Sequence, residues 1–516
     1  MIKHSLHYLL KGIKGVDSDA LIEVSVDLFV SGLTLDSRTI KQGMLFVALK
    51  GTQAHGVKYA LKAQQQGAVA IIYEADLTQN ESKLLADLTI PTIEIKELAR
   101  QLGEIARRYY QILDDNQLRK ANYGLKVIGV TGTDGKTTVT HFFAQAMNAL
   151  VANKAAVIGT LGIGFPNDLQ QATHTTPDVL TVHKTLHQLA KKGVEYIAME
   201  VSSHALDQER VNGVDFDVAI LTNLTRDHLD YHGTVENYTV AKQKLFLRPE
   251  VNTVVLNQED AFSQQIVDKL KQKGSNKALL RYAVKSENTD IDAELIAQNA
   301  SFSNKGIQAQ ISYGDQQGML KVAVLGWFNL SNLLATLAAM LSLGVQFSEA
   351  LEALSHVKTV SGRMDKVNAS DVLVVVDYAH TPGALESVLK ALRGHTQQRI
   401  FCVFGCGGDR DKGKRPLMAK IAEQDADVVI VTDDNPRTEN PQAIMRDIMA
   451  GFKQAEKIVI EHDRAKAIRY AMRQAQAGDV VLIAGKGHEQ VQIFAHKTEM
   501  FDDRQQAAEA LQELAI

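Results

Sequence analysis

The stretch Leu125–Thr138, with the sequence LKVIGVTGTDGKTT, constrains the fold of this chain more than any other. A short β-branched run, Lys126–Val130, precedes the glycines. Apolar residues recur at helical spacing after them, which predicts a strand, a turn and a helix. Gly132 and Gly135 let backbone amides approach an anion at the positive end of the helix. The sequence therefore predicts a phosphate site at this turn.

The residues that follow the glycines support a nucleoside triphosphate as the ligand. Lys136 can reach the outer phosphates and the Thr137 hydroxyl can ligate magnesium, as in the pattern GxxxxGK[ST]. The match is incomplete, because Val130 stands where the pattern has its first glycine. A plain glycine turn beside a surface lysine is the alternative interpretation. ATP or GTP is the ligand that we expect.

The composition excludes several classes of protein. At 516 residues the chain is too long for one core and is expected to form about three domains. Its 56 basic and 60 acidic residues balance, so no electrostatic surface for nucleic acid is indicated. No apolar run is long enough for membrane insertion and no signal peptide is recognised. Cys402 and Cys406 fit neither a disulfide framework nor a zinc site, so we expect a cytoplasmic monomer with buried or turn thiols.

The pattern of elements divides the chain into three α/β domains. Residues 1–112 form a small first unit, with strands expected at Leu45–Leu49 and Ala68–Tyr73, and residues 114–124 resemble a linker. Residues 125–353 form a central unit with the mostly parallel sheet of a P-loop ATPase. Residues 354–516 alternate strand, loop and helix, which predicts a doubly wound, Rossmann-like domain. Its expected strands are Val372–Val376, Arg399–Phe404, Asp427–Val431, Lys457–Ile460 and Asp479–Ile483.

Polar residues follow the ends of two buried strands in the central unit. Val194–Val201 and Phe216–Leu221 are the continuous apolar runs that parallel strands buried on both faces require. Because ligands bind at the carboxyl edge of such a sheet, Glu200 is a candidate ligand of the nucleotide's magnesium. His228 is a second candidate, although a lone histidine in a loop is more often only a hydrogen-bonding residue.

The hydrophobic pattern changes in the rest of the central unit. The segment Thr253–Leu325 has short alternating runs with turn signals, which predicts antiparallel hairpins on the edge of the sheet. A helix is expected over Gly326–Gly344, and polar residues lie at its start. Asn329 and Asn332 there fit either a helix cap or contacts with a base.

Four loops of the last unit carry charged and polar residues: DYAHTPGA, GCGGDRDKGKR, TDDNPRTENP and AGKGHE. A dinucleotide site is excluded, because Arg410 stands where the third glycine of GxGxxG would fall. Guanidinium groups bind carboxylates, and carboxylate or amide oxygens hold an ammonium, so the loops suit an amino acid. The residues concerned are Arg410, Arg437, Asp434, Asn435 and Glu489. The basic run Arg410–Arg415 is by default a solvated turn.

Several motifs occur in an order that resembles the Mur ligase family of peptidoglycan synthesis. They are TGTDGKTT, MEVSSH, TNLTRDHLDYHG, GWFNLSNLLA, SGRMD, DYAHTP, GCGGDRDKGKRPLM and TDDNPR. The resemblance covers nearly the whole chain, and the family's phosphate loop shares the departure at Val130. It implies a UDP-substrate-binding domain, a central ATP-binding ligase domain and a Rossmann-like amino-acid-binding domain.

The resemblance also implies roles for residues that the residue types alone do not single out. The loops Leu33–Arg38 and Lys50–Gly56 are typical of ordinary surface turns, yet the family places UDP there, at Leu35, Ser37, Thr52, Gln53 and Ala54. The muramoyl-dipeptide would lie on Thr175, Thr176, Ser202, Gln208 and Arg210, with His174 where an asparagine was expected. Lys242 resembles a solvated helix residue but matches the lysine that carries a carbamate in this family, as N6-carboxylysine.

The nucleotide and amino-acid sites follow in the same way. ATP would lie on Gly132, Thr133, Asp134, Gly135, Lys136, Thr137, Thr138, Asn329, Arg363 and Asp377. Magnesium would be held by Thr137, Glu200 and His228, and catalysis would rest on Lys136, Glu200, His228 and Lys242. Diaminopimelate would contact Arg410, Asp434, Asn435, Pro436, Arg437, Gly485 and Glu489.

The implied reaction is ATP-driven amide formation on UDP-N-acetylmuramoyl-L-alanyl-D-glutamate through an acyl phosphate. The family associates the sequence DNPR, here Asp434–Arg437, with meso-2,6-diaminopimelate as the added amine. Three alternatives remain: a lysine-adding ligase, a related ligase of the folylpolyglutamate type, and a nucleotide-gated binding protein that hydrolyses ATP as a switch. Phosphate release that requires both the carboxylate and the amine substrate would distinguish the ligase from the switch.

Overall fold

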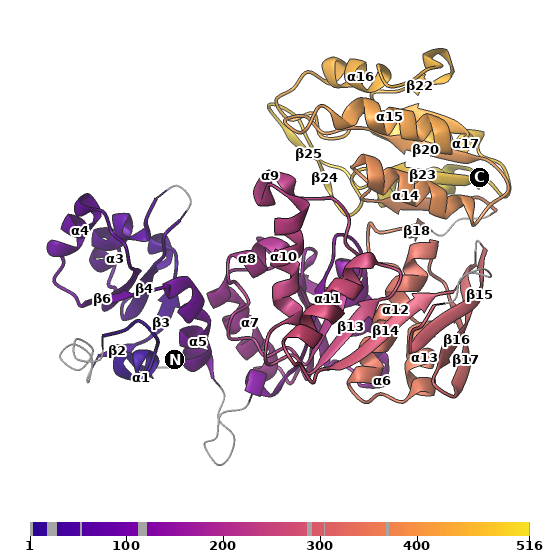
Figure 1. The fold of residues 1–516 in the computed structure, drawn as a ribbon. Coiled ribbons are helices and arrows are strands. Elements are labelled where there is room, and N and C mark those ends of the chain that lie inside the picture. The colour runs from indigo at the N-terminus through magenta and orange to yellow at the C-terminus, as the bar shows by residue number, and fades with distance from the viewer. Residues whose placement is uncertain are drawn as a thin grey trace. The chain divides into compact units, whose positions relative to one another are not determined.

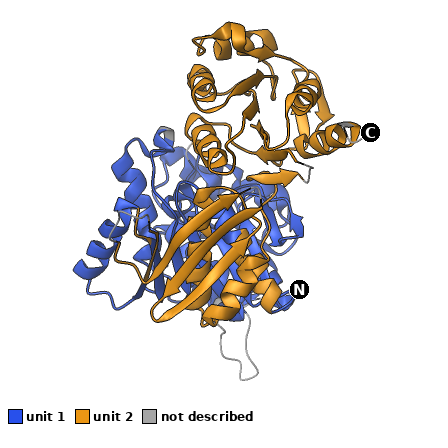
Figure 2. Cartoon of the chain, turned by 90° about the vertical axis from the view of Figure 1, so that its right-hand side faces the viewer, with its two compact units in different colours: residues 1–140, 151–256, 260–279 blue, residues 141–150, 257–259, 280–516 orange. Residues whose placement is uncertain are grey.

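The computed structural model describes residues 4–17, 28–51, 54–111, 121–285, 291–303, 305–367 and 371–514 (Figure 1). The chain forms two compact units (Figure 2). The first comprises residues 1–140, 151–256 and 260–279, and the second comprises residues 141–150, 257–259 and 280–516. The domain limits expected near residues 112 and 353 stay predictions.

The N-terminal part of the first unit contains a four-stranded parallel sheet in the order β3-β4-β5-β6. Its strands are β3 (Gly32–Thr34), β4 (Met44–Ala48), β5 (Ala70–Glu74) and β6 (Thr92–Ile95). The helices are α1 (Leu6–Leu10), α3 (Ala60–Gln65), α4 (Gln79–Ala86) and α5 (Leu98–Tyr110), and β1 (His4–Ser5) pairs with β2 (Phe29–Val30). The two strands expected here are confirmed. Strands β3 and β6 were not predicted, because they are too short to give a clear sequence pattern.

A second sheet of the first unit has the order β10-β9-β8-β11-β7-β12-β13. Its strands are β7 (Lys126–Thr131), β8 (Ala155–Gly159), β9 (Gly162–Phe165), β10 (Asp168–Gln170), β11 (Tyr196–Glu200), β12 (Val218–Leu221) and β13 (Thr253–Asn257). Strands β8, β11, β7, β12 and β13 are parallel, so the residues after β7, β11 and β12 meet at one edge. The helices are α7 (Val179–Lys191), α8 (Ser203–Asp207), α9 (Leu229–His232), α10 (Val235–Phe246) and α11 (Ala261–Gln272), and α6 (Lys136–Leu150) begins in this unit.

The expectation of hairpins throughout Thr253–Leu325 was wrong for its first half. β13 is parallel to β12, the amphipathic helix α11 follows it, and β14 (Ala278–Val284) pairs in parallel with β15. Among the described residues of this segment, the antiparallel pairs are formed by β15 (Leu295–Ser303), β16 (Gly306–Tyr313) and β17 (Gln316–Val322), in the second unit. The continuous apolar core of β13 is the signal that distinguishes it from a half-exposed hairpin strand.

The C-terminal part of the second unit has a six-stranded sheet in the order β18-β19-β23-β20-β21-β22. Its strands are β18 (Asp365–Val367), β19 (Leu373–Asp377), β20 (Ile400–Phe404), β21 (Val428–Val431), β22 (Val459–Ile460) and β23 (Val480–Ala484). The five strands expected from the sequence are confirmed within two residues and are parallel, whereas β18 is antiparallel to β19. The remaining elements of the unit are α12 (Trp327–Ser342), α13 (Phe347–Ser355), α14 (Pro382–Arg393), α15 (Lys414–Asp425), α16 (Pro441–Met449), α17 (Arg464–Gln474), α18 (Asp503–Leu514), β24 (Val491–Ile493) and β25 (Thr498–Met500).

Alternate residues of these strands build two cores, one on each face of the sheet. Val375, Cys402 and Leu482 pack with α14, α15 and α16, whereas Val374 and Val481 pack with α17 and α18. This is the doubly wound arrangement that the sequence predicts. Both cysteines are buried and free, as expected. In the described part of the chain, every helix is too short or too polar to cross a membrane.

Candidate active site

The turn between β7 and α6 has the geometry of a phosphate loop. Gly132 and Gly135 have φ values of +154° and +83°, and a Cβ at Gly132 would lie 1.8 Å from Thr222 Oγ1. A side chain is therefore excluded at Gly132. Lys136, the first residue of α6, donates from Nζ to the carbonyl oxygens of Gly132 at 2.9 Å and Thr133 at 2.7 Å. The loop thus brings a lysine and a helix N-terminus to one anion-binding turn.

Glu200 lies at the end of β11, next to this turn, and is 1% exposed. Its Oε2 accepts hydrogen bonds from Thr137 Oγ1 at 3.0 Å and Thr160 Oγ1 at 3.1 Å, and its Oε1 accepts from Thr160 N at 2.8 Å. Burial raises the pKa of Glu200, against the opposing effect of the Lys136 charge and these hydrogen bonds. Thr160 was not predicted from the sequence, although its place after the apolar run Ala155–Ile158 is a usable signal.

Lys242 is a second buried titratable group beside the loop. The side chain, 1% exposed, extends from α10 and donates from Nζ to Gly132 O at 2.7 Å, and its Nζ lies 4.6 Å from the centre of the Tyr238 ring. Burial, and then the nearby charge of Lys136, lower the pKa of Lys242 well below its usual value. The interpretation of Lys242 as a solvated helix residue was wrong.

His228 is more open than Glu200. It lies in a left-handed conformation (φ +52°) before α9, and its side chain is 46% exposed. Its ring is 5.0 Å from the ring of His204 and 6.1 Å from that of Tyr238. No group of three or more His, Cys, Asp or Glu side chains able to hold a metal occurs among the described residues. The acceptors that suit a hard cation here are the Thr137 hydroxyl and the Glu200 carboxylate.

The residues expected to hold the muramoyl-dipeptide form one hydrogen-bonded group. Thr175 Oγ1 accepts from Thr160 Oγ1 at 3.1 Å, which connects the group to Glu200. Thr176 Oγ1 donates to Glu200 O at 2.7 Å and accepts from Ser202 N at 3.0 Å. Arg210 donates to Thr176 O, and its guanidinium also donates to Gln208 Oε1. His174 is exposed and contacts Thr173.

The residues expected to hold UDP lie in the N-terminal part of the first unit. Ser37 is buried in a short helix that Asp36 caps, next to the half-buried Leu35. Ala54 is exposed. Thr52 and Gln53 lie outside the described residues.

The second unit holds the other residues expected to bind ATP. Asn329, on the first turn of α12, donates from Nδ2 to Leu325 O at 2.6 Å and accepts from Asn332 Nδ2 at 2.9 Å. Asp377, at the end of β19, accepts from the backbone amides of Met364 and Ala379, and burial raises its pKa. Near Asp377, the Arg363 guanidinium lies 4.9 Å from the centre of the Tyr378 ring, and its buried Nε has no hydrogen-bond partner in the described part of the chain.

The loops after β19, β20, β21 and β23 surround one cavity of about 320 Å³. Its lining includes Arg410, Asp434, Asn435, Arg437, Gly485 and Glu489. Six of the seven residues expected to bind diaminopimelate are therefore brought together; Pro436 is absent from the lining. The carboxyl ends of parallel strands meet at one edge, which explains why loops far apart in the sequence share this cavity.

The two arginines of the cavity have no carboxylate partner among the described residues. Arg410 donates from Nη1 to Asp409 O at 3.0 Å, and Arg437 donates from Nη1 to Gly408 O at 2.9 Å. A Cβ at Gly407 would lie 2.7 Å from Arg437 Nη1 and 3.8 Å from Arg410 Cγ, so both side chains pass close to this glycine. Both guanidinium groups keep donors for the carboxylates of a ligand.

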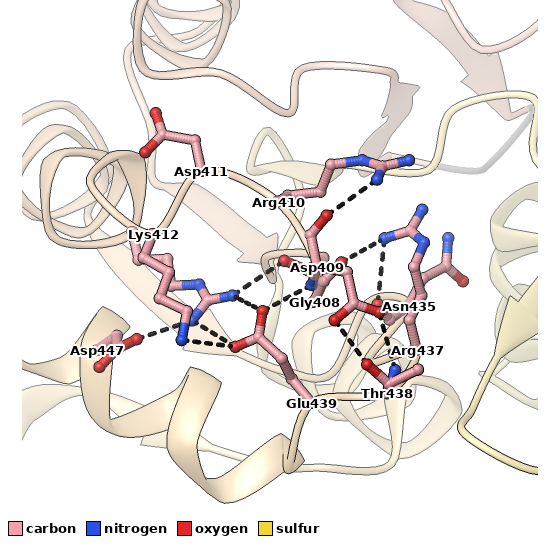
Figure 3. Close-up of polar contacts among 12 residues, drawn as sticks. Gly408, Asp409, Arg410, Asp411, Lys412, Asn435, Arg437, Thr438, Glu439 and Asp447 are labelled. Carbon is pink, nitrogen blue, oxygen red and sulfur yellow. Dashed lines mark hydrogen bonds and ion pairs between the residues drawn. The ribbon is translucent and has the colours of Figure 1, made fainter.

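An ion-pair network around the buried Arg415 fixes the loops that carry these arginines (Figure 3). Arg415, whose side chain is 0% exposed, donates to Glu439 and Asp447 at 2.7–3.1 Å. Glu439 also accepts from the backbone amide of Asp409, and the hydrogen bonds from Arg415 lower the pKa of Glu439 to about 2. Asp409 accepts from the amide and hydroxyl of Thr438. The interpretation of Arg410–Arg415 as only a solvated turn was therefore wrong at Arg415.

Lys486, which was not predicted from the sequence, is fully buried and contacts two residues of the cavity lining. Its Nζ donates to Val491 O at 2.6 Å and Asn435 Oδ1 at 3.1 Å, and lies 3.4 Å from Glu489 Oε2. Asn435 Nδ2 donates to the same Glu489 oxygen at 2.8 Å. The lysine thus holds together two side chains of the cavity that come from different loops. The signal was its position in AGKGHE, between Gly485 and Glu489.

Family models match three parts of the chain. They are the Mur ligase family catalytic domain at residues 29–110, the Mur ligase middle domain at 130–340 and the Mur ligase glutamate ligase domain at 362–487. Together they span most of the described chain.

Curated relatives and solved structures agree with these models. Proteins named UDP-N-acetylmuramoyl-L-alanyl-D-glutamate–2,6-diaminopimelate ligase are similar to this chain. The one from Pseudomonas aeruginosa is 45% identical over 94% of the chain and 96% of its own length, and the one from Coxiella burnetii is 42% identical over 95% and 97%. A solved structure of a ligase of the same name has a TM-score of 0.72 at 35% identity, covering 94% of this chain and 96% of its own. The MurF ligase of Thermotoga maritima, solved in complex with ADP, shares the fold at a TM-score of 0.57 and 20% identity, covering 93% and 96%.

Proposed function

The chain belongs to the Mur ligase family, and from this we propose that it joins meso-2,6-diaminopimelate to UDP-N-acetylmuramoyl-L-alanyl-D-glutamate at the expense of ATP. The shared name of the curated relatives supports this reaction, a step in the synthesis of peptidoglycan precursors. The observation that carries the proposal is the cavity of the second unit, where Arg410 and Arg437 lie with Asp434 and Glu489. ATP as a substrate and two free thiols are consistent with a cytoplasmic setting.

The cavity matches the functional groups of diaminopimelate. Each end of this amino acid carries a carboxylate and an ammonium, which suit a guanidinium fork and a carboxylate of the protein. L-Lysine lacks one of the two carboxylates. A guanidinium desolvated for that carboxylate would be left unpaired, which makes lysine a poor substrate.

The reaction proceeds through an acyl phosphate. The D-glutamyl side-chain carboxylate attacks the γ-phosphorus of ATP, ADP leaves, and the amine then displaces inorganic phosphate from the acyl carbon. Lys136 and the amides of the phosphate loop bind and orient the phosphates. Thr137 and Glu200 would hold Mg²⁺, with His228 as a further ligand, and the ion would neutralise phosphate charge. The group from Thr175 to Arg210, with Leu35, Ser37 and Ala54, would position the UDP-linked substrate.

We further propose that Lys242 carries a carbamate. Its lowered pKa supports this, because only a neutral amine adds to carbon dioxide, and the product is an anion beside Lys136 and the phosphate loop. With ¹³C-labelled bicarbonate, the protein should show a carbamate signal by NMR, and a Lys242→Met variant should lack it. An identical signal from the variant would place the modification elsewhere.

The experiment that tests the function is phosphate release from ATP in the presence of UDP-N-acetylmuramoyl-L-alanyl-D-glutamate. Three arms supply meso-diaminopimelate, L-lysine or no amine. Turnover with diaminopimelate alone is the expected result. Turnover with lysine alone would identify a lysine-adding ligase, and equal turnover in all arms would identify an uncoupled ATPase and contradict the proposal.

A further inference from the structure

The loop after β19 brings a histidine to the amino-acid cavity. Asp377 ends this strand, Tyr378 and His380 both line the cavity, and Thr381 caps α14 immediately afterwards. Asp377, which is expected near the phosphates, and His380, which lines the cavity, are therefore three positions apart on one short loop. The reaction proposed above assigns no role to His380.

The hydrogen bonds of His380 determine its tautomer. Its Nδ1 lies 2.8 Å from Tyr378 O, and because a carbonyl oxygen only accepts, Nδ1 carries the proton. In the neutral ring Nε2 is then a bare acceptor. Nε2 has no hydrogen-bond partner in the part of the chain that the structure describes. The backbone of the same residue is fixed as well, since Lys414 Nζ donates to His380 O at 2.8 Å.

The charges around His380 favour its neutral form. Desolvation by its surroundings lowers the pKa of His380, and the positive charges of Lys414 on α15 and Arg363 lower it further. The bond to Tyr378 O and the negative charge of Asp434 oppose this shift. At neutral pH the ring is thus able to accept a proton through Nε2.

The charges near His380 and near Glu489 differ, so the two amines of a diamino acid would have different pKa values in the cavity. Glu489, on the loop after β23, offers a carboxylate that retains an ammonium, whereas the charge of Asp434, on the loop after β21, also acts on His380. His380 lies with the cations Lys414 and Arg363, which disfavour an ammonium. An amine held near His380 therefore loses its proton more readily than an amine held near Glu489.

We propose that His380 Nε2 is the general base that takes the proton from the attacking ammonium of the amino acid; this rests on the ligase function proposed above. The deprotonated nitrogen forms the C–N bond at the acyl carbon, and the bond from that carbon to the phosphate oxygen breaks. The second proton of the nitrogen leaves with inorganic phosphate. His380 then passes its own proton to solvent.

Two substitutions of His380 remove the proposed base and keep most of the contacts of the side chain. His380→Asn keeps a donor near the position of Nδ1 for Tyr378 O but has no atom at the position of Nε2, and His380→Gln keeps most of the length of the ring. Both should lower kcat with diaminopimelate by about 10² to 10³-fold, with little change in the KM for ATP. The acid limb of the kcat–pH profile, which reports protonation of the base, should disappear. His356→Gln, an exposed histidine paired with Glu352, is the matched control and should behave like the wild type.

Replacing diaminopimelate by hydroxylamine distinguishes a role as a base from a structural role. The nitrogen of hydroxylamine is largely unprotonated at neutral pH and needs no base. With ATP and the UDP-linked substrate, both variants should form the hydroxamate at close to the wild-type rate while ligation of diaminopimelate is lost. Equal loss of hydroxamate and ligation would show a structural role and overturn the proposal, as would ligation within about threefold of the wild type. A wild-type protein that ligates no amine would refute the ligase function itself.

Discussion

A buried lysine lies beside the phosphate loop of the first unit and another beside the cavity of the second unit that we propose for the amino acid, and the surroundings of the two lysines differ. Lys242 has one hydrogen-bond acceptor among the described residues, Gly132 O, and the positive charge of Lys136 nearby. Lys486 has three acceptors, from Asn435, Glu489 and Val491. An ammonium has three donors, so only Lys486 is fully satisfied.

This difference shows how burial can serve two purposes. A buried cation is costly unless hydrogen bonds and an opposite charge compensate its desolvation. Lys486 has both kinds of compensation and can order the cavity around it. Lys242 has no carboxylate within hydrogen-bond reach among the residues that the structure describes, and the resulting shift toward the neutral amine suits a reactive group.

Arg437→Ala should produce the largest effect and should be confined to the amino-acid cavity. Without the guanidinium, the preference for meso-diaminopimelate over L-lysine, measured as the ratio of kcat/KM values, should fall by up to about 10⁴-fold. The KM for ATP should stay unchanged. Arg473→Ala, at a 64% exposed side chain of α17, is the control. A variant that keeps the preference for meso-diaminopimelate would show that Arg437 does not bind the carboxylate that lysine lacks.

Lys136→Ala should lower the rate of the reaction without changing the preference among amines, which is the opposite of the effect expected for Arg437→Ala. Loss of this charge at the phosphates should lower kcat by about 10³-fold with any amine and leave the preference among amines unchanged. The control is Lys154→Ala, which removes a surface pair with Glu195. A change in amine preference in Lys136→Ala would mean that the phosphate loop and the cavity do not act as separable sites.

Lys486→Met should weaken the amino-acid cavity without removing any group expected to touch the ligand. Asn435 and Glu489 lose a shared donor and stay joined by their direct hydrogen bond, so kcat/KM for diaminopimelate should fall by about 10²-fold, mainly through KM. The KM for ATP should not change. Lys497→Met, at an exposed lysine paired with Glu499, serves as the control. Unchanged kinetics in Lys486→Met would show that Asn435 and Glu489 hold their positions unaided.

The smallest expected effect is on stability. Substituting Lys242 and substituting Lys486 should change the free energy of unfolding in opposite directions. In bicarbonate-free buffer at neutral pH, Lys242→Met should raise the free energy of unfolding by about 1 kcal/mol, whereas Lys486→Met should lower it by about 1–3 kcal/mol. The folded pKa of Lys242 lies below the usual 10.5, so below that pH the unfolded chain binds a proton more readily than the folded chain. The advantage of Lys242→Met should therefore shrink as the pH rises toward 10.5. Chemical denaturation at several pH values measures this, and an advantage that grows with pH would contradict the shift.

Features with a contiguous sequence signal were predicted correctly. The phosphate loop and the five parallel strands of the second unit follow from glycine spacing, β-branched runs and alternation with helices. Prediction failed where a residue's role depends on neighbours far along the chain. Arg415 is buried because Glu439 and Asp447 meet it from another loop and helix, and β13 belongs to the parallel sheet because β12 lies beside it.

Local sequence patterns were enough to predict the strand, turn and helix of the phosphate loop, the doubly wound sheet and the residue types available for an amino acid. Those features depend on local periodicity and on the small menu of backbone conformations. The three-dimensional structure was needed to show that Lys242 is buried with one acceptor among the described residues and that Lys486 contacts both Asn435 and Glu489. It was also needed to show that His380 lines the cavity and that its Nε2 has no partner in the described part of the chain. Burial and hydrogen-bond partners come from segments distant in the chain, and these set the charge state and the reactivity of a side chain.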